Sequence, residues 1–214
     1  MSWLAAGPDP SSPGPGSLGP SDLSPGAGSA RRRIRLASAS PRRRQLLEDA
    51  CFVVDVAPVA VDESWPGGPP ARAVLDIARR KLDRAAPASI PVLAADTVVL
   101  LGDQPLGKPA SPAEAEAMLA RLAGRTHTVI TGFCLRCEGG VSEQAVATLV
   151  TFRSLSADQI RRYVATGEPM DKAGAYGIQG RGGALVDHVD GSYTNVVGLP
   201  LAEVIALYDR ECKS

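Results

Sequence analysis

The stretch that decides the fold runs Leu36-Ala37-Ser38-Ala39-Ser40-Pro41-Arg42-Arg43-Arg44-Gln45-Leu46-Leu47. Its first residues, preceded by Ile34 and Arg35, predict a short buried strand, and Ser40 followed by Pro41 predicts the first turn of a helix. Free N–H groups at the start of a helix favour an anion, and guanidinium groups match phosphate oxygens. This strand-to-helix turn therefore indicates either a phosphate site or an ordinary capped helix with a solvated basic turn.

Short apolar segments alternate with amphipathic ones after this turn, which is typical of an α/β fold. We expect strands at residues 51–56, 92–101, 126–136, 141–152 and 184–189, the third and fourth forming a hairpin. We expect helices at residues 70–86, after Ser111, from Ser156 to Gly167 and after Pro200, with capping boxes at the two serines. The segment 168–183 contains too many glycines for a regular element and is expected to be a loop.

Composition narrows the class of protein. The chain has 214 residues, of which 44% are hydrophobic, so it can bury one good-sized core and a single-domain enzyme is expected. Lys plus Arg and Asp plus Glu number 23 each, which argues against a general nucleic-acid or membrane-surface binder. Any basic site must therefore be local, and we expect neither nucleic acid nor a membrane as a partner.

Residues 1–30 differ from the rest, because they are rich in Pro, Gly and Ser and contain no Lys or Arg. Such a segment cannot bury enough apolar surface to offset its ordering entropy, so we predict a disordered leader followed by one domain over residues 31–214. The leader lacks the features of a signal or transit peptide, and no later stretch is long enough to span a membrane. We therefore expect a cytoplasmic protein.

Cysteine and histidine do not predict a metal site. The four cysteines include one CxxC pair, and no second pair of Cys or His completes a zinc site, so we expect reduced thiols at Cys51, Cys134, Cys137 and Cys212. His127 and His188 lie on strands far apart in the sequence, and each is expected to be a satisfied structural histidine.

Asp96 is the acidic residue most suggestive of chemistry, because it interrupts the most apolar strand of the chain. A buried carboxylate is costly unless it is paired, hydrogen-bonded or bound to a metal. At a strand end beside a polyphosphate it would hold Mg²⁺ or activate a water, and the alternative is a carboxylate that merely caps a turn. Asp62 and Glu63 follow the second strand, so either is a candidate second metal ligand or an ordinary solvated acid.

Lysine is scarce, and its placement is therefore informative. Lys108 lies in a turn just after the Asp96 strand, and Lys172 lies in the glycine-rich loop, where both are placed to reach phosphate oxygens as point charges. Lys81 is either an exposed helical residue or a functional one. Gln179, in the same loop as Lys172, can both donate to and accept from a base edge.

Several of these motifs together carry a family resemblance. The chain resembles the Maf family of nucleoside triphosphate pyrophosphatases over about residues 34–210. The motifs that match in order are Ser38-Ala39-Ser40-Pro41-Arg42-Arg43, Asp62-Glu63, Lys81, Ala95-Asp96-Thr97-Val98-Val99, Gly107-Lys108-Pro109, Gly124-Arg125-Thr126-His127, the loop from Glu168 to Gly180, and Gly191-Ser192-Tyr193 with Val197-Gly198-Leu199-Pro200.

The resemblance implies a two-lobed α/β fold with a long mixed sheet and a cleft, similar to the inosine triphosphate pyrophosphatases. It implies hydrolysis of a nucleoside triphosphate to the monophosphate and pyrophosphate, with a divalent cation, Mg²⁺ or Mn²⁺, as cofactor. Asp96 would be the general base, and Glu63 would help Asp96 to hold the metal. The residues implied to contact the triphosphate are Ser40, Arg42, Arg43, Lys81, Lys108 and Lys172.

Within the family, three positions mark the branch that acts on dTTP and UTP, and here they are Arg42, Thr97 and Gln179. The alternative substrate is 7-methyl-GTP, but members of that branch depart from the pattern that Ala173 to Gly180 keeps intact. A non-catalytic nucleotide-binding regulator of cell division is a further alternative, suggested by the family's older name of septum-formation inhibitor. The resemblance also implies a homodimer, and Arg44 is expected to lie on the surface.

Overall fold

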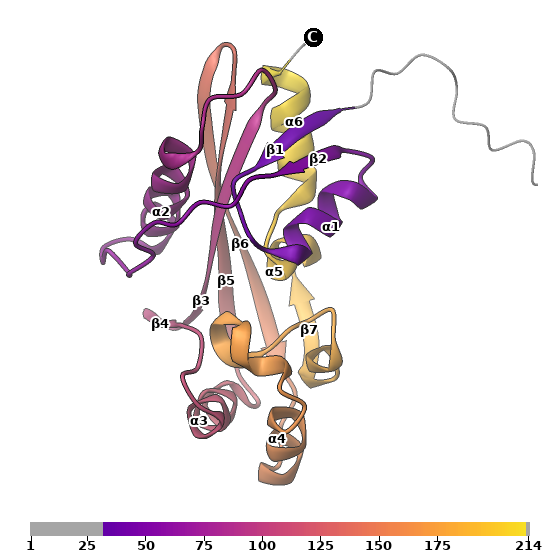
Figure 1. The fold of residues 1–214 in the computed structure, drawn as a ribbon. Coiled ribbons are helices and arrows are strands. Elements are labelled where there is room, and N and C mark those ends of the chain that lie inside the picture. The colour runs from indigo at the N-terminus through magenta and orange to yellow at the C-terminus, as the bar shows by residue number, and fades with distance from the viewer. Residues whose placement is uncertain (1–31, 213–214) are drawn as a thin grey trace, which may run out of the picture. The chain divides into compact units, whose positions relative to one another are not determined.

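The computed structural model describes residues 32–212, so the predicted leader lies outside the described residues. The described residues form a mixed sheet flanked by helices, which confirms the α/β class (Figure 1). The sheet has seven strands in the order β2-β1-β3-β5-β6-β7, and β4 pairs with β3 off this path. The strands are β1 (Arg33–Leu36), β2 (Val53–Val56), β3 (Val92–Leu101), β4 (Gln104–Leu106), β5 (Thr126–Cys137), β6 (Gly140–Phe152) and β7 (Val186–Asp190).

Strand β3 changes neighbours along one of its edges, and this change opens the sheet locally. Its first residues pair in parallel with β1 as far as Leu93, and its last residues pair antiparallel with β4 from Val99 onward. Between these two pairings β3 has no strand partner on that edge within the described residues, whereas β5 pairs with it along the other edge. Asp96 and Thr97 lie in this gap, which is the middle of β3 rather than the strand end that we predicted.

The helices begin at serine or proline residues, as the sequence predicts. The side chains of Ser40, Ser111 and Ser156 each accept a hydrogen bond from the backbone N–H three residues later. The capping box is complete at Ser156, but at Ser111 the partner Glu114 instead accepts from the N–H of Ala110. The helices are α1 (Pro41–Asp49), α2 (Pro70–Arg84), α3 (Pro112–Leu122), α4 (Ala157–Val164), α5 (Tyr193–Val197) and α6 (Leu201–Glu211).

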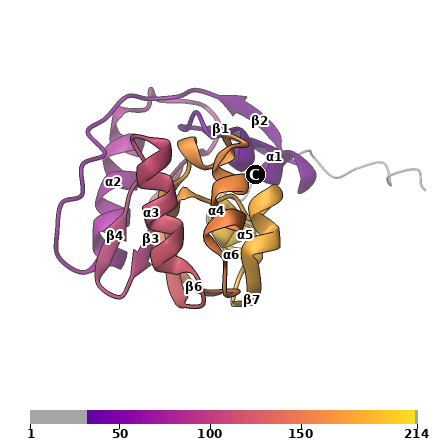
Figure 2. The same ribbon diagram turned by 90° about the horizontal axis from the view of Figure 1, so that it is seen from below.

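The helices cover the long strands in separate groups. Helix α2 packs on one face of β3 and β5, and α1, α5 and α6 lie on the other side of the sheet (Figure 1). Helices α3 and α4 lie side by side at the far end of the long strands (Figure 2). They enclose their own hydrophobic cluster around Leu119 and Phe152, distinct from the clusters around Leu36 and Leu82 at the first end. This separation of the cores agrees with the expected two-lobed arrangement.

The close approach of α2 to the sheet depends on a glycine. Gly132 on β5 lies directly opposite Asp96 on β3. A Cβ atom at Gly132 would lie 2.9 Å from the backbone of Val74 and Leu75 on α2, which is closer than carbon atoms normally approach. This glycine therefore sets the distance between α2 and the β3 gap.

Short elements account for most differences from the sequence prediction. Strand β4 and helix α5 span only a few residues each and were not predicted, because neither is long enough to show a periodic apolar pattern. The glycine-rich segment, expected to be a loop, contains three short 3₁₀ helices, Glu168–Asp171, Ala173–Ala175 and Arg181–Leu185. Helix α4 ends before Gly167, which follows it in the left-handed conformation that glycine adopts readily.

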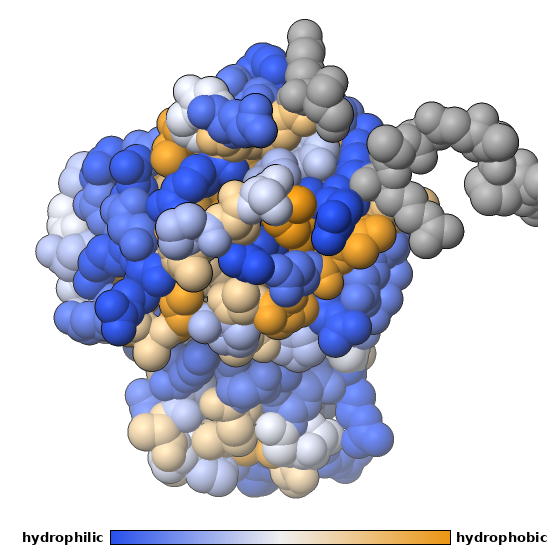
Figure 3. Space-filling model, turned by 45° about the horizontal axis from the view of Figure 1, so that its top comes forward, coloured by the Kyte–Doolittle hydropathy of each residue, from blue (hydrophilic) through white to orange (hydrophobic). Residues whose placement is uncertain are grey.

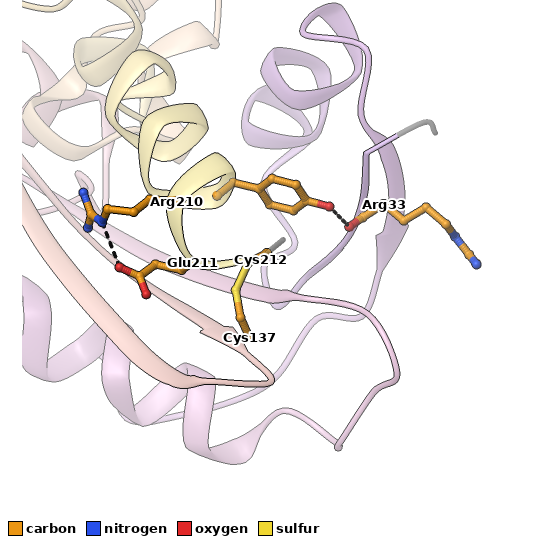
Figure 4. Close-up of a disulfide and its surroundings, with 6 residues drawn as sticks. Arg33, Cys137, Arg210, Glu211 and Cys212 are labelled. Carbon is orange, nitrogen blue, oxygen red and sulfur yellow. Dashed lines mark hydrogen bonds and ion pairs between the residues drawn. A yellow bond between two sulfur atoms is a disulfide. The ribbon is translucent and has the colours of Figure 1, made fainter. Parts of the chain in front are cut away.

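One disulfide corrects the expectation that all thiols are reduced. Cys137, at the end of β5, is bonded to Cys212, just after α6, across a sequence separation of 75 residues (Figure 4). Cys51 is free and exposed. Cys134, the other member of the CxxC pair, is free and buried, and burial raises the pKa of its thiol to about 12. The bond joins the C-terminal helix to the β5–β6 hairpin.

Apolar residues occur in small patches broken up by polar ones on the face shown in Figure 3. Among residues 32–212, no helix has both the length and the apolar character needed to cross a bilayer.

Candidate functional site

A cavity of about 650 Å³ opens at the gap in β3. Its walls come from the turn before α1, from α2, β3 and the loop after β4, and from the glycine-rich segment. All ten residues that the sequence nominates line it: Ser40, Arg42, Arg43, Glu63, Lys81, Asp96, Thr97, Lys108, Lys172 and Gln179. The fold thus brings together residues up to 139 positions apart, counted from Ser40 to Gln179.

On the α2 face of β3, Lys81 bridges two carboxylates. Its Nζ lies 2.8 Å from Oδ1 of Asp96 and 2.8 Å from Oε1 of Glu63, and the residue is only 5% exposed. An ammonium group this deeply buried needs such partners, because an unpaired buried charge is strongly destabilising. Partial burial acts to raise the pKa of Glu63, but the hydrogen bond and charge of Lys81 outweigh it, so the pKa is lowered. Glu63 is therefore ionised at neutral pH.

On the opposite face, Arg43 is held by neutral acceptors. Its Nε donates to the carbonyl oxygen of Gly198 at 2.7 Å, its Nη1 to the Ser38 hydroxyl at 3.1 Å and its Nη2 to the Thr97 hydroxyl at 2.9 Å. The residue is only 8% exposed. Each of its three nitrogens thus has a protein acceptor, and a contact with phosphate would use the N–H groups that remain.

The hydroxyl of Thr97 continues this network into the core. It lies 2.9 Å from the Thr131 hydroxyl on β5, which donates to the carbonyl oxygen of Asn195 at 3.2 Å. Asn195 is completely buried and its side-chain amide donates to Val129 and Thr148. The network fixes the turn before α1 and the α5 region to the same point of β3.

The glycine-rich segment supplies a third wall with a charged side chain that the sequence reasoning missed. Asp171 accepts from Nζ of Lys172 at 2.6 Å and pairs with Nη1 of Arg42 at 3.4 Å. Burial acts to raise the pKa of Asp171, yet Lys172 and Arg42 together lower it. Asp171 adjoins Lys172 in the sequence, so this pair of opposite charges was the signal that could have indicated Asp171 as a site residue.

Two predicted site residues face the cavity without partners. Lys108 and Gln179 are exposed, and within residues 32–212 neither side chain makes a hydrogen bond or an ion pair. Their polar ends are therefore available to a ligand. Lys108 also acts to lower the pKa of Glu63, which places its charge near the carboxylates.

Tyr176 lines the cavity and is supported from behind by a histidine. Nε2 of His127 lies 2.8 Å from the Tyr176 hydroxyl, and His127 is only 2% exposed. Burial lowers the pKa of His127 to about 4, so the ring is neutral, and its Nδ1 has no partner among the described residues. His127 is thus only half satisfied, and His188 lies exposed on β7.

A divalent metal would find two acidic donors here. Within the described part of the chain no group of three or more His, Cys, Asp or Glu could hold a metal ion. Glu63 and Asp96 contact the same ammonium group, so they lie close enough together to share one cation. Mg²⁺ is commonly held by one or two carboxylates together with substrate phosphates, so this pair fits. Asp62 does not line the cavity, and its Oδ1 accepts from the N–H of Ser64 at 2.8 Å.

The cavity therefore combines the carboxylate pair Asp96 and Glu63 on one wall with cationic groups on the others, and the third wall also carries the acids Glu168 and Asp171. Such an arrangement suits a ligand that carries several negative charges and needs a water activated beside it. The uncharged loop backbone and Gln179 leave room for a less polar part of the same ligand.

The chain is similar to known proteins over most of its length. A family model described as "Maf-like protein" matches residues 33–211. A relative from Anaeromyxobacter dehalogenans (strain 2CP-C), named dTTP/UTP pyrophosphatase, is 52% identical over 183 residues, which cover 83% of this chain and 93% of the relative. A relative of the same name from Moorella thermoacetica is 52% identical over 176 residues, or 79% of this chain and 90% of the relative.

A third relative named dTTP/UTP pyrophosphatase, from Myxococcus xanthus, is 49% identical over 180 residues, or 82% of this chain and 90% of the relative. A solved structure described as a nucleoside-triphosphatase and dITP/XTP pyrophosphatase, from Mycobacterium abscessus, covers 84% of this chain and 94% of its own at 13% identity. Its TM-score is 0.37, which is too low for an inference.

Proposed function

The chain belongs to the family of Maf-like proteins, and from this premise we propose that it hydrolyses dTTP and UTP to the nucleoside monophosphate and pyrophosphate. The observation that carries the proposal is the pair of carboxylates, Asp96 and Glu63, held by Lys81 in a cavity whose other walls carry the cationic side chains of Arg42, Arg43, Lys108 and Lys172. The relatives named dTTP/UTP pyrophosphatase support the same reaction.

Asp96 is the general base. It accepts a proton from a water as the water oxygen forms a bond to the α-phosphorus. The bond between that phosphorus and the bridging oxygen to the β-phosphate breaks, and pyrophosphate leaves with the electron pair. Lys81 keeps the Asp96 carboxylate oriented through its 2.8 Å contact.

The cationic walls bind the triphosphate and stabilise the charge that grows on it. Lys108 and Arg42 approach from the loop after β4 and from α1, and Ser40 lies at the N-terminus of α1, where free N–H groups favour an anion. Lys172 donates to the backbone oxygen of Glu168 at 2.7 Å and joins the same walls. Arg43 is more deeply buried, so it acts mainly by holding the turn before α1 in place.

Glu63 and Asp96 are the residues that would hold a divalent cation, Mg²⁺ or Mn²⁺. When bound, such an ion neutralises charge on the phosphate oxygens and on the leaving pyrophosphate.

Base selection is assigned to Arg42, Thr97 and Gln179. Gln179 and Arg42 line the cavity directly, and the amide of Gln179 can pair with a carbonyl and an N–H on one base edge. Thr97 acts less directly, because its hydroxyl is already engaged with Arg43 and Thr131.

A nucleotide panel tests the proposal. The protein is incubated with dTTP, UTP, 7-methyl-GTP, ATP and GTP in the presence of Mg²⁺ or Mn²⁺, and both pyrophosphate and the monophosphate are measured. We expect dTTP and UTP to be the preferred substrates, each giving the two products in equal amounts. Preference for 7-methyl-GTP would overturn the base assignment, and tight nucleotide binding without pyrophosphate release would favour the non-catalytic regulator. The expected homodimer and cytoplasmic location stay predictions.

A further inference from the structure

A second cavity of about 360 Å³ lies outside the proposed active site, between the end of β6, helix α4 and the 3₁₀ helix Arg181–Leu185. Its lining shares no residue with the first cavity. Its apolar part consists of Leu155, Ala184, Leu185 and the ring of Tyr163. The remaining lining residues are polar or cationic, and none is acidic: Arg153, Ser154, Gln159, Arg162, Thr166 and Arg181.

The three arginines of this cavity gather at one place without an acidic partner. Within residues 32–212, the guanidinium groups of Arg153, Arg162 and Arg181 take part in no ion pair and no hydrogen bond. Several exposed arginines elsewhere in the described chain are paired, among them Arg44 with Glu48 and Arg79 with Asp83, whereas Arg84 and Arg125 are unpaired within residues 32–212 but do not line this cavity. Like charges that line one cavity repel each other, and an anion bound between them removes that repulsion.

We propose that Arg153, Arg162 and Arg181 form a second ligand site, which binds the diphosphate or triphosphate group of a small molecule. Guanidinium groups recognise phosphate oxygens through paired N–H donors, and three of them from three separate elements match more than one phosphate. The Ser154 hydroxyl adds a neutral donor. The apolar part of the cavity accommodates a base or a ribose, so the phosphate group belongs either to a nucleotide or to free pyrophosphate.

This site lies directly behind one wall of the first cavity. The hydroxyl of Tyr163 donates to Oε1 of Glu168 at 2.9 Å and accepts from the N–H of Gly177 at 3.1 Å, and both partners line the first cavity. The backbone N–H of Arg181 donates to Oε2 of Glu168 at 2.9 Å. A ligand held by Arg181 and packed on Tyr163 would therefore touch the residues that support Glu168 and Gly177.

Calorimetric titration without added metal tests the proposal, with inorganic pyrophosphate as one probe and a non-hydrolysable dTTP analogue as the other. A triple variant, Arg153→Gln, Arg162→Gln and Arg181→Gln, is compared with a control of equal charge, Arg79→Gln, Arg121→Gln and Arg210→Gln. For at least one probe, we expect the triple arginine variant to bind one equivalent fewer than the wild type binds. Alternatively, it binds that equivalent at least ten-fold more weakly. The control should bind like the wild type.

The proposal is overturned if the arginine variant binds both probes like the wild type, or if the control loses as much binding. Loss of an equivalent for pyrophosphate alone identifies the free anion as ligand, and loss for the analogue identifies a nucleotide. If the proposed active site bound neither probe, the wild type would bind one equivalent and the arginine variant none. If the second site did not exist, the wild type and the arginine variant would bind alike, so the failures of the two proposals can be distinguished. Arg162→Gln alone, which removes an exposed side chain, replaces the triple variant if that variant does not fold.

Discussion

The two faces of β3 at its gap differ sharply, although the residues that mark them are adjacent in the sequence. Asp96 points toward α2 and meets the ammonium of Lys81, whereas Thr97 points toward α1 and meets the guanidinium of Arg43. Successive residues of a strand project to opposite faces, so one dipeptide serves both sides. The gap left between β1 and β4 lets the same cavity reach both residues.

This difference indicates which face of β3 takes part in the reaction. The α2 face holds ionised groups whose partners are also charged, and Glu63 is half exposed there. The α1 face holds one buried cation among neutral acceptors that are themselves fixed in the core. We infer that the first face performs the chemistry and that the second keeps the walls in position.

Asp96→Asn gives the largest expected effect, because it removes the general base and half of the carboxylate pair. We expect turnover of dTTP and UTP to fall by at least about 10³-fold, while the circular dichroism spectrum stays that of the wild type. The matched control is Asp103→Asn in the exposed turn before β4, which should keep full activity. Wild-type turnover by Asp96→Asn would show that the α2 face does not perform the chemistry.

Lys81→Met tests whether the α2 face depends on the bridge between its carboxylates. We expect turnover to fall by about 10²-fold, on the scale of a lost positioning contact. Without Lys81 the pKa of Glu63 loses the two strongest influences that lower it, while burial still acts to raise it and Lys108 and Arg43 lower it more weakly, so the carboxylate stays protonated to a higher pH. The acidic limb of the pH–rate profile should therefore move to higher pH.

The control for that variant is Arg84→Met, which removes an exposed cation from the last turn of the same helix. An acidic limb that did not move, or that moved equally in the control, would contradict the role of Lys81.

Arg43→Lys tests the α1 face, because it keeps the charge but replaces three forked donors by one point of contact. We expect the free energy of unfolding to fall by about 2–4 kcal/mol, since hydrogen bonds from charged groups contribute about 1.5–3 kcal/mol each. Turnover should fall by only about 10-fold, through loss of position. Denaturant unfolding and steady-state kinetics measure the two effects.

Arg44→Lys, one residue further along α1, is the control for this change. Arg44 is exposed, as predicted, and its partner Glu48 is on the same helix, so stability should change by less than about 0.5 kcal/mol. If Arg43→Lys lost activity as severely as Asp96→Asn while remaining stable, the α1 face would do more than keep the walls in position, and our inference would be wrong.

Thr97→Val gives the smallest expected effect. It removes the hydroxyl that joins Arg43 to Thr131, which should cost about 1–3 kcal/mol of stability because buried polar groups lose a partner. Thr97→Ser keeps the hydroxyl and should lie close to the wild type in thermal unfolding. A change in the ratio of dTTP to UTP turnover without loss of stability would show that Thr97 acts on base selection directly and not through Arg43.

Much of the fold and of the site could be predicted from the sequence, because local signals were strong. Ser40-Pro41 and Ser156 begin helices as their capping chemistry requires. The burial of Lys81, in contrast, was left open by the sequence, which allowed either an exposed helical residue or a functional one. In the structure Val74, Ile77 and Lys81 are all buried on one face of α2, so Lys81 needs an acidic partner.

Other features depend on contacts that the sequence does not reveal. The Cys137–Cys212 bond joins residues 75 positions apart, and nothing local distinguishes that pair from the other cysteines. The hydrogen bonds that occupy the Arg43 side-chain nitrogens depend on where the fold places Gly198 and Thr97. The half-satisfied state of His127 likewise follows from packing against Tyr176 and not from its motif.

The gap in β3 has a consequence for how this protein behaves at high concentration. An unpaired strand edge is a template on which a strand from another molecule can add, and that is how many sheets begin to aggregate. Here the open edge covers only residues 94–98, and β1 and β4 close it at both ends. A foreign strand of ordinary length, about 5–6 residues, would fill or exceed this opening, and the chain that continues on either side of it would collide with those neighbours, so the opening admits a small molecule but resists intermolecular β-pairing.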